Sequence, residues 1–140
     1  MLILRRAQIY TLKFGPLAAG GGKDQQKFQV DTEYDFELYK LTAYVFDANG
    51  IGVLETQWPH ITTVLQDGTT KQALTSDETP IRNVFGVGPL PHTFKEKHVV
   101  KGGATFFASL TNNAAAIAFS VYLSFEGILI VKGVNPEPTR

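Results

Sequence analysis

The chain has 140 residues, of which 44% are hydrophobic and 11% aromatic, a composition that fits one folded domain and argues against disorder. Its 13 basic and 13 acidic side chains give a formal net charge of zero, so we expect no DNA or RNA partner. The absence of cysteine excludes disulfides and thiolate metal sites and agrees with assembly in a reducing cytoplasm.

Short segments of alternating polarity, separated by turn residues, predict β-strands in the first half of the chain. The turn sequences Asp47-Ala48-Asn49-Gly50 and Asp67-Gly68 each predict a hairpin. The glycine-rich residues 15–23 are predicted to be a mobile loop between strands. The predicted strands cover residues 7–14, 27–30, 39–45, 51–57, 61–65 and 70–74.

The clearest pattern lies in the last third of the chain, where residues 119–131 alternate between apolar and polar side chains. Period two over this length predicts a half-buried strand. Because Ile128 and Ile130 make its second face apolar as well, we expect the far end of this strand to be covered on both sides. Residues 104–110 predict another strand of the same kind. We expect these two strands to be antiparallel neighbours at the centre of the core.

Helix signals are weak throughout the chain. The alanine-rich residues 114–118 lie between a turn and a strand pattern and predict a loop, and the proline-containing residues 79–93 predict irregular backbone. About seven or eight short strands with regular turns predict an all-β fold, an antiparallel sandwich that is jelly-roll-like. We expect a single domain over residues 1–134 with a short N-terminal arm, followed by an exposed tail over residues 135–140.

The residue patterns typical of catalytic and metal sites are missing, so we expect no enzyme activity and no cofactor. His60, His92 and His98 lack the paired spacing that a metal site on one strand or helix uses. Every second residue from Asp31 to Glu37 is acidic. The simpler interpretation is a solvated, acidic strand edge. The alternative is a calcium site or a glycosidase carboxylate pair. Residues 102–125 carry no charge, but their alternation favours strands over a membrane span.

The sequence around Trp58 suggests a contact surface. A tryptophan followed by proline and histidine could stack on a sugar, but a core or interface tryptophan is the simpler interpretation. The apolar start of the chain is a second segment that could reach a neighbouring molecule. The predicted partner-binding residues are Met1, Leu2, Ile3, Leu4, Trp58 and His60.

Residues 35–131 resemble the small jelly-roll decoration, cement and minor capsid proteins of tailed bacteriophages. The resemblance rests on an opening strand over residues 36–47, a proline-bounded crossing over residues 80–91, a strand between Val100 and Asn113, and a last strand that closes in Gly127. After Gly127 the chain departs from the commoner form, because Ile128 and Leu129 stand where aromatic and basic residues are usual.

This resemblance implies a virion structural protein, made in the cytoplasm of the host bacterium and located on the capsid surface. It implies binding to neighbouring major capsid subunits, self-association as a homotrimer, and no catalytic residues, nucleic-acid partner or membrane partner. The alternative left open by the sequence is a carbohydrate- or receptor-binding sandwich that uses Trp58, Tyr44 and the carboxylates near Asp31.

Overall fold

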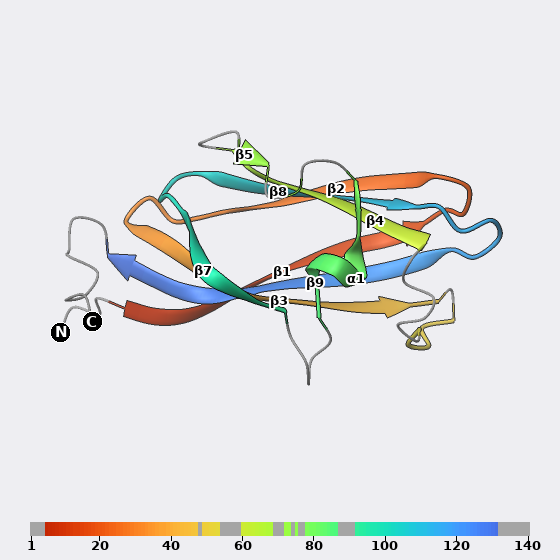
Figure 1. The fold of residues 1–140 in the computed structure, drawn as a ribbon, viewed down its shortest axis with the longest axis horizontal. Coiled ribbons are helices and arrows are strands. Elements are labelled where there is room, and N and C mark those ends of the chain that lie inside the picture. Colours follow the sequence, from red (N-terminus) through yellow and green to blue (C-terminus); the bar gives the residue numbers. More distant parts are fainter. Residues whose placement is uncertain are drawn as a thin grey trace.

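The computed structural model is a sandwich of two antiparallel β-sheets that lie one above the other (Figure 1). It describes residues 5–47, 49–53, 60–68, 72–73, 75, 78–86 and 92–131. Sheet A contains, in spatial order, β1 (Arg5–Leu17), β9 (Phe119–Val131), β3 (Tyr34–Phe46) and β7 (His92–Val100). Sheet B contains, in spatial order, β2 (Gly22–Gln29), β8 (Thr105–Asn112), β4 (Ile61–Asp67) and β5 (Gln72–Ala73).

The order of the strands is that of a jelly roll. The chain passes from one sheet to the other at each connection from β1 to β4, and again at each connection from β6 to β9. As a result, the late strands β9 and β8 lie between early strands, β9 between β1 and β3, and β8 between β2 and β4. This double winding is typical of two-sheet jelly rolls. The predicted jelly-roll-like β-sandwich is therefore confirmed.

The prediction that the strands at residues 104–110 and 119–131 are paired neighbours is wrong. The first strand is β8 and pairs with β2 and β4, whereas the second is β9 and pairs with β1 and β3. The connection over residues 113–118 is the predicted loop, but it crosses from sheet B to sheet A. Both strands nevertheless occupy the centre of their sheets, because each is hydrogen-bonded on both sides.

The core between the sheets is built around phenylalanine rings from both layers. Phe28 of β2 stacks on Phe106 of β8, with ring centroids 5.4 Å apart. From sheet A, the rings of Phe36 and Phe125 approach Phe28 to 6.0 and 5.2 Å. These contacts join strands that are distant in sequence, so they fix how the two sheets sit against each other. The largest fully buried side chains are Phe14, Phe36, Phe85, Phe106, Phe119, Phe125, Leu17, Leu38, Leu41, Ile61, Leu65 and Ile81.

The far end of β9 is covered on both faces, as predicted. Leu129 points into the core, and Ile130, which points to the opposite face, is also buried. The opening strand and the strand predicted at residues 27–30 are confirmed as β1 and β2, and both are longer than predicted.

The glycine-rich segment predicted to be a mobile loop is ordered, and most of it belongs to β1 and β2. Only residues 18–21 form the turn between these strands. In this turn Gly20 and Gly21 have φ angles of 81° and 105°, which glycine adopts without strain. Their amides donate hydrogen bonds of 2.7 Å to the carbonyls of Ala114 and Asn112. The turn is therefore tied to the loop between β8 and β9.

The two predicted hairpins are confirmed as far as the described residues reach. After the turn at residues 47–50, Val53 donates a backbone hydrogen bond of 2.8 Å to Val45. The rest of that returning segment, residues 54–57, lies outside the described residues. In the second hairpin, β4 and β5 pair through Gln66 opposite Ala73.

The segment predicted to be irregular contains two elements, and a strand follows it. The two-residue strand β6 (Thr79–Pro80) pairs with β4, and the four-residue helix α1 (Ile81–Val84) follows directly. The helix forms because Ile81 and Phe85, one turn apart, both anchor in the core. The strand β7 was missed, because three successive charged residues at 95–97 obscure its alternation. Such charges are common on edge strands, and β7 is an edge of sheet A.

The described part of the chain has no helix of the length and apolar character that a membrane crossing would require. The N-terminal arm at residues 1–4 and the end of the chain from residue 132, including the predicted tail, lie outside the described residues.

Asn112 connects three segments at one end of the sandwich. Its side-chain amide donates to the carbonyls of Leu17 and Ile117, at 2.9 and 2.8 Å, and its oxygen accepts from the amide of Ala114 at 3.0 Å. The side chain is fully buried, so water cannot replace these three bonds.

We expect Asn112→Ala to lower the free energy of unfolding by about 3 kcal/mol, because two carbonyls and one amide lose their buried partner. Urea denaturation followed by circular dichroism measures this loss. The neighbouring exposed Asn113 provides the matched control, since Asn113→Ala should change stability by no more than about 0.5 kcal/mol. Equal losses in the two variants would contradict the role assigned to Asn112.

Candidate docking surface on sheet A

The outer face of sheet A is defined by the residues that alternate with the core positions of β1, β9 and β3. The register between these strands places the outward side chains in rows that cross the sheet. From one end of the sheet to the other, the rows are Lys13–Tyr122–Tyr44, Thr11–Ser124–Thr42, Ile9–Glu126–Lys40, Ala7–Ile128–Glu37 and Arg5–Ile130–Asp35.

Aromatic side chains gather at one end of this face. Tyr44 is 57% exposed and Tyr122 is 37% exposed, although both rings belong to central strands of the sheet. Phe46 stacks on Tyr44, with centroids 4.6 Å apart, and meets Tyr122 edge-on at 5.3 Å. The Lys13 ammonium lies 5.4 Å from the centre of the Tyr122 ring. We call Lys13, Tyr44, Phe46 and Tyr122 the aromatic cluster.

The middle of the same face is hollowed beside a β-bulge. The register between β3 and β9 shifts at Tyr39, which is the extra residue of the bulge. Opposite it stands Gly127, where a Cβ would collide with the carbonyl oxygen of Glu37. The hollow has a volume of about 370 Å³ and is lined by Tyr39, Lys40, Glu126, Gly127 and Ile128. Ile9, from the row that holds Glu126 and Lys40, is 54% exposed.

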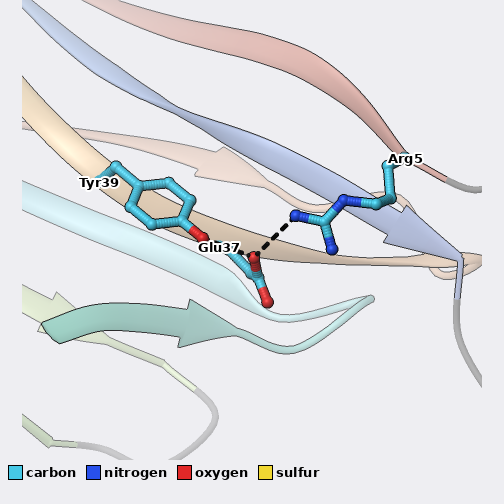
Figure 2. Close-up of polar contacts among 3 residues, drawn as sticks. All are labelled: Arg5, Glu37 and Tyr39. Atoms are coloured by element: carbon cyan, nitrogen blue, oxygen red, sulfur yellow. Dashed lines mark hydrogen bonds and ion pairs between the residues drawn. The ribbon is translucent and has the colours of Figure 1, made fainter. Parts of the chain in front are cut away.

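A buried carboxylate, that of Glu37, lies close to Tyr39 of the bulge (Figure 2). Glu37 is only 3% exposed, although it points to the outer face of the sheet. The Tyr39 hydroxyl donates a hydrogen bond of 2.9 Å to Glu37 Oε1, and Arg5 Nη2 lies 3.7 Å from the same oxygen. Arg5 reaches it from β1 across the intervening strand β9 (Figure 2). A buried carboxylate is tolerated where a countercharge and a hydrogen-bond donor compensate its desolvation, as they do here.

The predicted acidic strand edge is therefore wrong, because β3 is an inner strand and its carboxylates have separate partners. Asp31 lies in the turn before β3 and accepts a hydrogen bond from the Glu33 amide at 3.1 Å. Asp35 accepts from the Gly102 amide at 2.8 Å. Within the described ranges, no three His, Asp or Glu side chains are grouped so that they could hold a metal ion.

A histidine and a carboxylate form a close pair between the two sheets, an arrangement that also occurs in the catalytic triads of hydrolases. His98 Nε2 lies 2.9 Å from Asp67 Oδ2, and Asp67 is fully buried. A hydrolase triad also needs a hydroxyl nucleophile bonded to the imidazole. In the part of the chain that the structure describes, no serine or threonine hydroxyl is hydrogen-bonded to His98. We infer that the pair has a structural role and holds β7 of sheet A against β4 of sheet B.

Of the partner-binding residues predicted from the sequence, only His60 lies within the described residues, and it is not part of the aromatic cluster. His60 is exposed and leads into β4 of sheet B, where its carbonyl accepts a hydrogen bond of 2.7 Å from Asn113. Met1, Leu2, Ile3, Leu4 and Trp58 lie outside the described residues. Of the cluster, the sequence pointed only to Tyr44. Tyr122 and Phe46 carried a signal too, because large aromatic residues at outward positions of an alternating strand are exposed.

Comparison with models of protein families, with curated proteins and with solved structures gave no match to this chain. Its function is therefore inferred from its own fold and surface. Exposed aromatic rings on a broad sheet face are typical of surfaces that bind a partner.

We expect Tyr39→Phe to lower the free energy of unfolding by about 1–2 kcal/mol, because the buried carboxylate of Glu37 loses a hydrogen-bond donor. Chemical denaturation measures the loss. Tyr34→Phe is the matched control, since the Tyr34 hydroxyl has no hydrogen bond to any described residue, and this variant should match the parent protein. A Tyr39→Phe protein as stable as the parent would contradict the role of the bond to Glu37.

Proposed function

We propose that this chain is a bacteriophage virion structural protein, a capsid decoration or cement protein that binds neighbouring major capsid subunits through the outer face of sheet A. The observation that carries the proposal is the exposed aromatic cluster. Aromatic residues are enriched at the centres of protein interfaces, where they contribute much of the binding energy. Two exposed tyrosines on inner strands of a sheet are therefore best explained by a partner that covers them.

The charges of this face also suit a protein partner. The register places the opposite charges of Lys40 and Glu126 on neighbouring strands, and Glu37 has its countercharge in Arg5. Local compensation lowers the cost of removing a face from water, because no excess of one sign has to be desolvated. A cement protein needs a contact of this kind, since it covers a protein lattice rather than a nucleic acid.

We include self-association as a homotrimer in the proposal. A trimer presents three copies of the same face, so each contact can be weak while the assembly binds tightly. Sedimentation equilibrium of the purified protein tests this element directly. We expect a mass three times that of the 15.4 kDa chain. A monomer at all concentrations would remove the trimer from the proposal.

The carbohydrate-binding alternative is less well supported by the shape of the cluster. A sugar stacks on the open face of an aromatic ring. The rings of Tyr44 and Phe46 are nearly parallel, with an angle of 17° between their planes, so each covers one face of the other. Mutual stacking favours a protein side chain packing against the exposed edges of the rings.

We expect the double variant Tyr44→Ser, Tyr122→Ser to bind undecorated capsids at least about tenfold more weakly than the parent protein, because two interface aromatic residues are lost. Co-sedimentation with capsids assembled without the protein measures the change. Gln25→Ser is the control, since Gln25 is exposed on β2, which belongs to sheet B.

Parent-like capsid binding by the double variant would contradict the proposed surface. A glycan-array signal of the parent protein that Tyr44→Ser abolishes would instead establish the carbohydrate-binding alternative.

A further inference from the structure

The strand β1 leaves a long sheet edge open. It runs over 13 residues and pairs with β9 along one side. Along its other side, no described residue forms a backbone ladder with it, because β1 is the last strand of sheet A. The open backbone amides and carbonyls of such an edge are a template for one more strand.

The open edge is basic. The sequence of β1 contains Arg5, Arg6 and Lys13 and no acidic residue. Arg6 and Lys13 are exposed, and neither forms an ion pair with a described carboxylate. Each is instead placed over an aromatic ring, Arg6 5.3 Å from the centre of Tyr34 and Lys13 5.4 Å from the centre of Tyr122. The rings hold the two cations at the strand while leaving their charge available.

A polar cleft runs beside this edge, between the two sheets. It has a volume of about 450 Å³, with Arg6, Gln8 and Tyr10 on its β1 side and Gln29 and Asp31 on the other. Arg6, Gln8, Tyr10 and Gln29 supply hydrogen-bond donors next to the open backbone, whereas the carboxylate of Asp31 accepts.

The Tyr10 hydroxyl is one of these donors. Its ring is fixed by stacking on Phe28, with centroids 4.3 Å apart. The hydroxyl has no hydrogen bond to a described residue. Burial raises the pKa of Tyr10, Arg6 lowers it and Asp31 raises it further, so the phenol remains protonated well above neutral pH.

We propose that an extended acidic segment of a partner protein adds to β1 as a further strand of sheet A. Its backbone pairs with the open edge, and its carboxylates lie against Arg6 and Lys13. Side chains on one face of the segment enter the cleft beside Gln8 and Tyr10, and those on the other face lie next to Ile9. This inference deepens the proposed function, since the capsid would supply the segment, but it can be tested without a capsid.

The basic residues of β1 favour an acidic segment over the β1 strand of a second copy of this chain as the added strand. In an antiparallel pair of β1 strands centred on Ile9, Arg5 of one copy would face Lys13 of the other. Like charges directly opposite each other destabilise a strand pair. The basic residues therefore discourage pairing between copies and attract an acidic strand.

The test uses a fluorescent peptide of about ten residues, a length close to that of β1, in which pairs of glutamates alternate with pairs of valines. This spacing puts carboxylates on both faces of the added strand, so that they can reach both Arg6 and Lys13. Fluorescence anisotropy measures its binding to the full chain. We expect Arg6→Glu to weaken binding by about tenfold or more, because an attraction becomes a repulsion. Lys27→Glu, the same charge change at an exposed position of the neighbouring edge strand β2, should leave the affinity within about twofold of the parent.

Two further measurements separate strand addition from simple charge attraction. The same peptide with methylated backbone amides keeps its charge but cannot donate to β1, and we expect it not to bind. Hydrogen exchange of the parent protein should show that the peptide protects amides of β1, which tests the proposal even if Arg6→Glu fails to fold.

The proposal is overturned if the parent protein does not bind the acidic peptide, if the methylated peptide binds equally well, or if Lys27→Glu weakens binding as much as Arg6→Glu. Each of these results leaves the aromatic cluster untested and intact. The single variant Tyr44→Ser leaves Tyr122 in place beside Lys13 and should still bind the peptide. A loss of peptide binding can therefore be told apart from a loss of the proposed capsid contact.

Discussion

The burial of phenylalanine rings between the two sheets is the interaction on which the rest of the structure depends. Phe28 contacts the rings of Tyr10, Phe36, Phe106 and Phe125, so five strands from both layers meet at one ring. Each such ring contributes about 1.5–3 kcal/mol by leaving water. Because side chains on a strand alternate, fixing the rings inward also fixes which residues point outward. The exposure of Tyr44 and Tyr122 follows from the position of the core.

Alternation in the sequence was enough to predict the sandwich, but it could not predict which strands are neighbours. The alternating residues of β8 and β9 specify which face of each strand is buried. The same alternation would be found whether the two strands pair with each other or lie in opposite sheets. Only the contacts of the whole core decide between these arrangements. The strand β7 was missed for a related reason, because an edge strand needs only part of its surface buried and tolerates charged residues.

The candidate site was less predictable than the fold. Arg5 and Glu37 come together because β9, from the far end of the chain, lies between their strands, and no local pattern records this. The predicted site residues at the start of the chain and at Trp58 lie outside the described residues, whereas the aromatic cluster combines β1, β3 and β9. One sheet thus carries both an exposed aromatic face and an open basic edge, and Lys13 belongs to both.

The orientation of the protein on its partner tests the central claim most directly. A cryo-electron microscopy reconstruction of capsids carrying this protein would show which sheet lies against the capsid. The account predicts that sheet A faces the capsid subunits, with Tyr44 and Tyr122 covered and sheet B turned outward. A reconstruction in which sheet B contacts the capsid and the aromatic cluster stays exposed to solvent would contradict it.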